Sequence, residues 1–138
     1  MKAGRSFVFR LPKGADIGES LTAFCLKKGV RRAWLTLIGA TTKARLGYYD
    51  QRRRRYCDKE FRGEMEILSA SGNVSLKDGK PFAHIHATLG DAKYRVWGGH
   101  LLASEVFAAE AWLQELPGPA LVRLPDPETG LALWKLPR

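Results

Sequence analysis

The sequence predicts one domain built mainly from antiparallel β-strands, with a helix near its start. The chain has 138 residues, 45% of them hydrophobic, which suits a single domain with a core of ordinary size. In several segments apolar residues recur at a spacing of two, as they do in strands with one buried face. Between two of these segments stands the pair Asp78-Gly79, which is typical of a tight hairpin turn. We therefore expect residues 1–138 to form one domain.

The first strand and the helix are the clearest elements. Apolar residues alternate over residues 5–11, which predicts a strand that ends before Pro12. Asp16 can cap a helix, and Glu19, three residues later, completes a capping box. Gly29 is a natural stop at the other end of that helix. The apolar stripe of the helix, which places the Cys25 thiol in the core, consists of Ile17, Leu21, Phe24 and Cys25.

The rest of the chain predicts further strands. Residues 33–39 are almost continuously apolar, which indicates a buried strand and places Trp34 in the core. Residues 103–116 are ambiguous, because their alanines and glutamates favour a helix while their apolar residues also alternate. Two short strands, at residues 121–124 and 131–136, flank a turn. The remaining predicted strands cover residues 44–50, 60–68, 73–76, 82–89 and 94–101.

The charge of the chain is distributed unevenly. Its formal charge of +9 and pI of about 9.9 suit a polyanionic partner such as nucleic acid, although many basic proteins bind none. Residues 1–62 carry 16 Lys and Arg against 5 Asp and Glu, whereas residues 63–138 carry 7 against 9. Any electrostatic attraction to nucleic acid is therefore expected from the first half.

Cysteine usage and hydropathy suggest a compartment. Cys25 and Cys57 are the two cysteines and form no C-x-x-C pair, so the sequence indicates neither a disulfide framework nor a zinc ribbon. No run of 18 apolar residues could cross a membrane, and the first residues lack the apolar run of a signal peptide. We expect a cytoplasmic protein with reduced thiols and no membrane contact.

One basic run could contact nucleic acid. Arg52, Arg53, Arg54 and Arg55 stand between tyrosines at positions 48, 49 and 56, so phosphate-binding cations lie beside rings that could stack on bases. The same composition suits the solvated tip of a β-hairpin, where arginines keep an edge soluble. Both interpretations remain open at the level of sequence.

All three histidines of the chain lie between Phe82 and Leu101. His84 and His86 are two residues apart, so in a strand both side chains lie on one face, about 6–7 Å apart. If the following hairpin is centred on residue 92, His84 lies across from His100 and all three imidazoles share that face. Three neutral imidazoles could then hold zinc with one open position, or they could simply hydrogen-bond within a sheet. The preceding pair at positions 98 and 99, Gly-Gly, indicates a close backbone approach or a bulge.

Five segments together resemble one known family. They are "GRSFVFRLPKGADIGESLTAF", "IGATTKARLGYYD", "GEMEILSASGNVSLKDGKPFAHIHATLGD", "VWGGHLL" and "DPETGLALW". Their order and spacing resemble the PPC domain family, the stand-alone prokaryotic form of the domain that follows the AT-hook in plant nuclear proteins. The resemblance implies a compact α+β fold with a mainly antiparallel sheet and few helices, assembled as a homotrimer. It also favours a strand over residues 105–116 and marks His84, His86 and His100 as a metal or ligand site.

The resemblance implies less about function than about fold. Plant members bind AT-rich DNA through an Arg-Gly-Arg-Pro hook, which this sequence lacks. Residues 63–68 here are "GEMEIL", where the plant domain has Gly-Arg-Phe-Glu-Ile-Leu for partner binding. We expect a homotrimeric DNA-binding or regulatory module in which residues 52–55 contact the nucleic acid. The alternative is a zinc-binding protein or metal-dependent enzyme that uses the three histidines.

Overall fold

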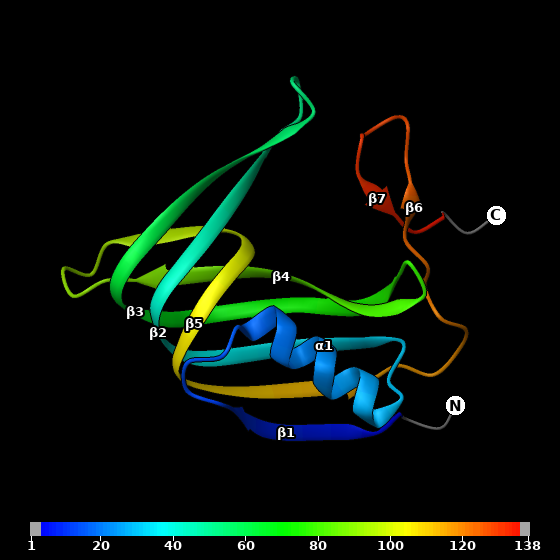
Figure 1. Ribbon diagram of the computed structural model, residues 1–138, viewed down its shortest axis with the longest axis horizontal. Coiled ribbons are helices and arrows are strands. Elements are labelled where there is room, and N and C mark those ends of the chain that lie inside the picture. The colour runs from blue at the N-terminus through cyan, green and yellow to red at the C-terminus, as the bar shows by residue number, and fades with distance from the viewer. Residues whose placement is uncertain (1–3, 136–138) are drawn as a thin grey trace.

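The computed structural model describes residues 4–135. Figure 1 shows one helix and a large twisted sheet, with a short two-stranded hairpin at the C-terminal end. The elements in chain order are β1 (Ser6–Leu11), α1 (Ile17–Lys28), β2 (Ala33–Asp50), β3 (Arg55–Lys77), β4 (Lys80–Gly90), β5 (Val96–Glu115), β6 (Leu124–Pro125) and β7 (Ala132–Leu133). The expected α+β fold with a mainly antiparallel sheet is confirmed.

The large sheet is antiparallel throughout and partly closes on itself. Its strand order is β1-β5-β2-β3-β4, and β5 also pairs with β4. This is possible because β5 is long. Its first part, Val96–His100, pairs with β4, whereas the rest pairs with β2 on one side and, over residues 109–114, with β1 on the other. Register shifts between β2 and its neighbours allow the long strands to bend. The histidine-bearing strands therefore meet at the closure of the sheet.

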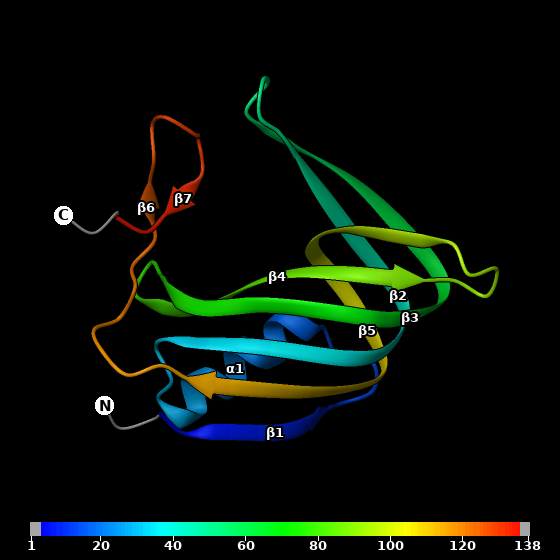
Figure 2. The same cartoon turned by 180° about the vertical axis from the view of Figure 1, so that it is seen from behind.

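Helix α1 forms as the capping residues predict. The side chain of Asp16 accepts a hydrogen bond from the backbone N–H of Glu19, and Gly29 ends the helix with a left-handed φ of 67°. The helix packs on β4 and β5, and Figures 1 and 2 show it on one side of the sheet only. The core between helix and sheet includes Ile17, Leu21, Cys25, Leu35, Val74, Ile85, Leu89 and Leu113.

Several predicted strands turn out to be parts of longer ones. Residues 33–39 and 44–50 both lie in β2, and residues 60–68 and 73–76 both lie in β3. Residues 103–115 continue β5, so the strand interpretation of the ambiguous segment is confirmed. Of the strand predicted at 121–124, Leu124 lies in β6, and of the strand predicted at 131–136, Ala132 and Leu133 form β7; residue 136 lies outside the described residues.

The outer face of β1, β5 and β2 is apolar and uncovered. Val8 on β1 pairs with Trp112 on β5. On the other side of β5, Trp112 pairs with Thr36 on β2, and Trp34 lies two residues before Thr36. Trp34 is 47% exposed and Trp112 43%, while Val8 is 80% exposed. The prediction that Trp34 lies in the core is wrong, because the apolar run at 33–39 places only alternate side chains in the core. This surface, the outer apolar face, comprises Val8, Trp34, Ile38 and Trp112.

The C-terminal segment, residues 118–135, packs beside the end of β3. Backbone hydrogen bonds join Leu76 to Leu121 and Arg123, each 2.8 Å long. The hydroxyl of Tyr49 donates to the carbonyl of Thr129 over 2.7 Å, so the β2–β3 hairpin also holds this segment. Among the described residues, no helix is long and apolar enough to span a membrane.

Candidate metal centre

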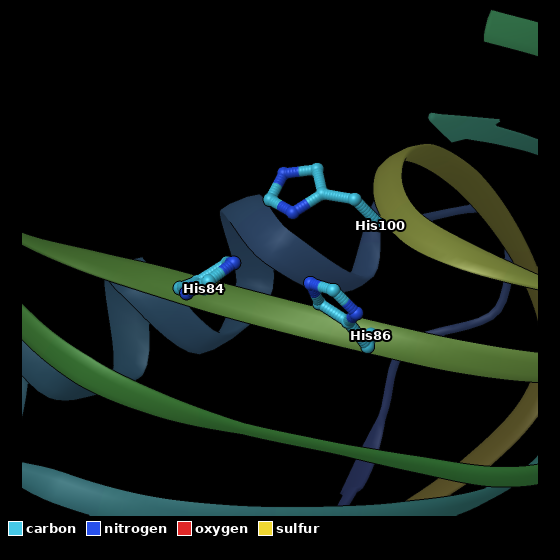
Figure 3. Close-up of side chains that lie close together, drawn as sticks. All are labelled: His84, His86 and His100. Atoms are coloured by element: carbon cyan, nitrogen blue, oxygen red, sulfur yellow. The ribbon is translucent and has the colours of Figure 1, made fainter. Parts of the chain in front are cut away.

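His84, His86 and His100 form a compact cluster. Their ring centroids lie 5.2 Å apart for His84 and His86, 4.9 Å for His84 and His100, and 5.5 Å for His86 and His100. Three ring nitrogens, one from each histidine, lie within 4.8 Å of one another. Figure 3 shows the three rings surrounding a common space. Three nitrogen donors at this spacing are suited to one transition-metal ion.

Strand alternation and pairing bring these side chains together. His84 and His86 alternate along β4 with Ile85 and Ala87, which are buried in the core. His86, rather than His84, lies directly opposite His100. The predicted register was therefore wrong by two residues. A shift of two preserves the face of every side chain, so the predicted convergence of the three histidines is found.

A close backbone approach fixes His100 at the junction of three strands. His100 pairs with His86 on β4 and with Gly47 on β2. A Cβ atom on Gly99 would lie only 2.8 Å from the carbonyl oxygen of Gly47, so a larger residue cannot fit without backbone movement. The close approach expected from the Gly-Gly pair is therefore found, and it draws β2 and β5 together beside the cluster.

Burial keeps two of the imidazoles neutral. The pKa of His84 is lowered to about 4, mainly by desolvation and then by the Arg123 charge and the other two histidines. Desolvation also lowers the pKa of His100, followed by the effects of His86 and Arg123. Neutral imidazole is the form that binds metal. The Nδ1 atom of His100 is buried without a hydrogen-bond partner, so it is a donor atom available to a metal.

Arg123 adjoins the cluster and was not identified from sequence. Its Nη2 atom lies 3.2 Å from Nδ1 of His84 and 3.0 Å from the side-chain oxygen of Asn73. Its Nε atom donates to the hydroxyl of Ser75 over 2.9 Å. Burial lowers the pKa of this guanidinium. No local signal marked Arg123, because the C-terminal segment meets β3 through contacts about fifty residues apart in sequence.

A pocket of about 890 Å³ opens beside the histidines. Its lining includes polar groups from the start of α1, the turn end of β3 and the C-terminal segment, together with apolar side chains. The lining includes His84, His100, Arg123, Phe82, Arg45 and Lys77. The volume is within the range of small-molecule sites.

The structure does not bring the arginine run to the histidines. Arg52, Arg53 and Arg54 form the turn between β2 and β3, and Arg55 begins β3. Figure 1 shows this hairpin extending away from the body of the sheet. Arg53 forms an ion pair with Asp50 over 3.1 Å, and Arg54 donates to the carbonyl of Pro127 over 3.0 Å. All four arginines are exposed.

The sequence profile of the Plants and Prokaryotes Conserved (PCC) domain matches residues 1–117. This chain belongs to the PCC domain family. The family resemblance drawn from the sequence is thereby confirmed, since PPC and PCC denote the same plant- and prokaryote-conserved domain. Arg123 and the rest of the C-terminal segment lie beyond the matched region.

Solved structures of proteins with similar sequences have the same fold. A metal-containing protein from Archaeoglobus fulgidus is 45% identical, with 98% of this chain and 96% of that chain covered and a TM-score of 0.94. A plant- and prokaryote-conserved protein from Pyrococcus horikoshii is 40% identical, with 99% and 95% covered and a TM-score of 0.94. A candidate DNA-binding protein from Bacteroides thetaiotaomicron is 29% identical, with 98% and 94% covered and a TM-score of 0.88.

A related sequence also occurs within a longer protein. The bifunctional protein GlmU of a Synechococcus strain is 31% identical over 127 residues, which make up 90% of this chain. The chain spans about one fifth of the length of that relative, since the match covers 19% of it.

Proposed function

We propose that the chain binds a divalent transition-metal ion, zinc in the first instance, through His84, His86 and His100. The observation that carries this proposal is that three imidazole nitrogens, one from each histidine, lie within 4.8 Å of one another. Two ligand nitrogens of one zinc ion lie at most about 4 Å apart, given bonds of about 2.0–2.1 Å. Side-chain movements on the order of 1 Å would therefore close the triangle around an ion.

This donor set suits a metal centre that reacts or takes up a ligand. Three neutral imidazoles leave the fourth tetrahedral position open to water or another ligand. Zinc in such a site lowers the pKa of its bound water to about 7, which would suit a metal-dependent enzyme. The 45% identical protein from Archaeoglobus fulgidus is metal-containing, which supports the proposal.

Metal analysis of protein purified without a histidine tag tests this function. We expect about one tightly held zinc ion per chain. His86→Ala should weaken zinc binding at least about tenfold. Thr88→Ala is the matched control, because Thr88 lies two residues along β4 on the same face. Less than about one third of an equivalent in the wild-type protein would contradict a stoichiometric site.

A second candidate function is DNA binding through the tip of the β2–β3 hairpin. The observation that favours it is that four exposed arginines, Arg52–Arg55, stand on a projecting hairpin of a chain with a formal charge of +9. The Bacteroides relative is a candidate DNA-binding protein, which supports this assignment. Arg52 and Arg55 are the stronger candidates for phosphate contact, since Arg53 and Arg54 already contact protein groups.

Fluorescence anisotropy with a labelled DNA duplex tests the second function. We expect affinity to fall steeply between 50 and 200 mM salt, and the slope to fall in an Arg52→Ala, Arg55→Ala double variant. Lys27→Ala with Lys28→Ala removes the same charge from the end of α1 and is the control. Equal loss of DNA binding in both double variants would mean that only the net charge of the protein matters, and it would overturn the assignment of the site to the hairpin.

We also propose that three copies of the chain associate through the outer apolar face. Val8, Trp34, Ile38 and Trp112 form an uncovered apolar surface across three strands, a feature that usually marks an interaction site. Light scattering should give a mass of three chains of 15.4 kDa each. Trp112→Glu should dissociate the assembly, whereas Tyr94→Glu, at an exposed aromatic residue of the β4–β5 turn, should not. A monomeric wild-type protein would exclude the trimer.

A further inference from the structure

Arg123 carries a partly buried charge without an acidic partner. In the part of the chain that the structure describes, no ion pair includes this residue. Its guanidinium lies over the rings of Phe82 and Trp134, 5.5 and 5.3 Å from their centroids. Aromatic faces stabilise a cation only modestly, and an unpaired buried charge is costly. An external anion would supply the missing charge.

Four of the five N–H groups of Arg123 meet neutral acceptors. The acceptors are the side chains of Ser75, Asn73 and His84 and the carbonyl oxygen of Ala132, which lies 3.1 Å from Nη1. An arginine has five N–H donors and no acceptor, so one donor on Nη1 remains unused. These four contacts orient the guanidinium, and its fifth N–H group can still donate to another ligand.

Metal binding would release a second donor. Because Arg123 can only donate, Nδ1 of His84 accepts, and the proton of the neutral ring lies on Nε2. A metal ion bound at Nδ1 would occupy that lone pair. A metal ion bound at Nε2 would move the proton to Nδ1, which then could no longer accept. In either case the contact between Arg123 and His84 is lost, and an N–H of Arg123 becomes free to bind another acceptor.

The loaded pocket would also carry excess positive charge. The metal cluster consists of histidines alone among the described residues, so a divalent ion there would lie beside the charge of Arg123. Lys77 adds another cation to the pocket lining, whereas the charge of Arg45 is paired with Asp58. The acidic side chains of the lining are Asp16 and Glu19, and Asp16 is already held by backbone N–H groups. The charge balance therefore favours an anion.

We propose that the metal-loaded pocket binds a small organic oxyanion, a carboxylate or phosphate, between the ion and the guanidinium of Arg123. This inference rests on the proposed metal site. The planar fork of arginine matches the two oxygens of such groups, and the pocket of about 890 Å³ has room for an organic body beyond the charged group. Phe82 provides an apolar wall for that body.

Binding of anion and metal is then coupled. The anion stabilises the state in which Arg123 has left His84, so it should raise the affinity for the metal, and the metal should raise the affinity for the anion by the same factor. We expect a coupling of at least about tenfold. Without anion, Arg123→Gln should bind metal as tightly as the wild type or more tightly, because a repelling charge and a competitor for His84 are both removed.

Cobalt(II) titrations followed by visible absorption test the inference. Malonate and inorganic phosphate are the two probes, and each should change the spectrum of the cobalt-loaded wild-type protein. Arg123→Gln should bind cobalt but lose anion affinity at least about tenfold. Arg45→Gln is the control, because Arg45 also lines the pocket but is paired with Asp58 over 3.3 Å. Preference for malonate over phosphate would assign the ligand as a carboxylate, and the reverse would assign a phosphate.

The cobalt titrations distinguish failure of the metal site from failure of the anion site. A wild-type protein that binds no cobalt contradicts the metal site itself. A protein that binds cobalt but responds to neither anion, or an Arg123→Gln variant that responds like the wild type, overturns the anion site alone. Should Arg123→Gln fail to fold, Arg123→Lys keeps the charge without the planar fork. A loss of at least about threefold in anion affinity would support the inference, and unchanged affinity would overturn it.

Discussion

The backbone N–H of Ser104 donates to Oδ2 of Asp16 over 2.7 Å, while Oδ1 of the same carboxylate accepts from Glu19 at the start of α1. The hydroxyl of Ser104 in turn accepts from the backbone N–H of Ile17. One capping residue therefore also joins the helix to β5, a few residues after His100. The sequence pattern of a capping box contains the bond from Glu19 but not the bond from Ser104.

Asp16→Ala should destabilise the protein by about 2–3 kcal/mol, measured by urea denaturation. Loss of the cap costs about 1 kcal/mol, and a backbone N–H that donated to a charged acceptor adds about 1.5 kcal/mol or more. Asp16→Asn is the matched control. It retains an acceptor for Glu19 but has no second oxygen for Ser104, so about half of the effect should remain. An Asp16→Asn variant as stable as the wild type would show that the bond from Ser104 contributes nothing.

Removal of a buried side chain from α1 should cost far more than removal of an exposed one. Leu21 is 0% exposed in the core, whereas Leu26 in the same helix is 66% exposed. Leu21→Ala should lower the free energy of unfolding by about 2–5 kcal/mol, because it leaves a cavity. Leu26→Ala should change it by less than about 0.5 kcal/mol. A small effect at Leu21 would mean that the helix is not docked on the sheet as described.

The two thiols should differ in reactivity. Burial raises the pKa of Cys25 to about 12, so almost no thiolate forms at neutral pH, whereas Cys57 is exposed. Ellman's reagent should modify about one thiol per chain rapidly in the native protein and the second only after denaturation. Cys57→Ser should abolish the fast phase, and Cys25→Ser should leave it intact. A fast phase that survives in Cys57→Ser would contradict the burial of Cys25.

Signals that act over a few residues could be predicted from sequence. The helix ends at Asp16 and Gly29 are an example, because capping depends on local backbone groups. The histidine cluster could be predicted for a similar reason. The turn after β4 has five residues, organised by the Asp91 carboxylate, which accepts from the backbone of Lys93 and Arg95. Because of that loop, the observed register differs from the predicted one by two residues. The partner of His100 is therefore His86 and not His84, but each side chain stays on the predicted face of the sheet.

Features that depend on distant contacts could not be predicted. Arg123 reaches His84 only because the C-terminal segment pairs with β3 at Leu76 and Val122. Nothing near Arg123 in the sequence specifies that contact. The prediction for Trp34 was wrong for another reason. An apolar residue on the outer face of a sheet has the same local sequence pattern as one in the core. The distinction requires knowledge of what covers that face, which for Trp34 is no element of the described chain.

The stability of the metal-free protein should fall as the pH falls from about 6.5 to about 4. Because the pKa of His84 is lowered to about 4 and that of His100 is also lowered, the unfolded chain takes up protons in this window that the folded chain excludes. For these half-buried groups the loss should be on the order of 1–2 kcal/mol. Urea denaturation at several pH values, with a chelator present, measures it.

The variant His84→Asn separates this effect from the titration of carboxylates. Asparagine keeps an acceptor for Arg123 but does not titrate, so the part of the pH dependence that His84 causes should disappear. The remaining slope would then come from His100 and from carboxylates such as Glu115, whose pKa is lowered by its hydrogen bond with Arg5 and whose effect begins nearer pH 4. An unchanged slope between pH 6.5 and 4.5 would mean that His84 is not desolvated in the folded protein, and the histidine cluster would then be more open to water than its geometry indicates.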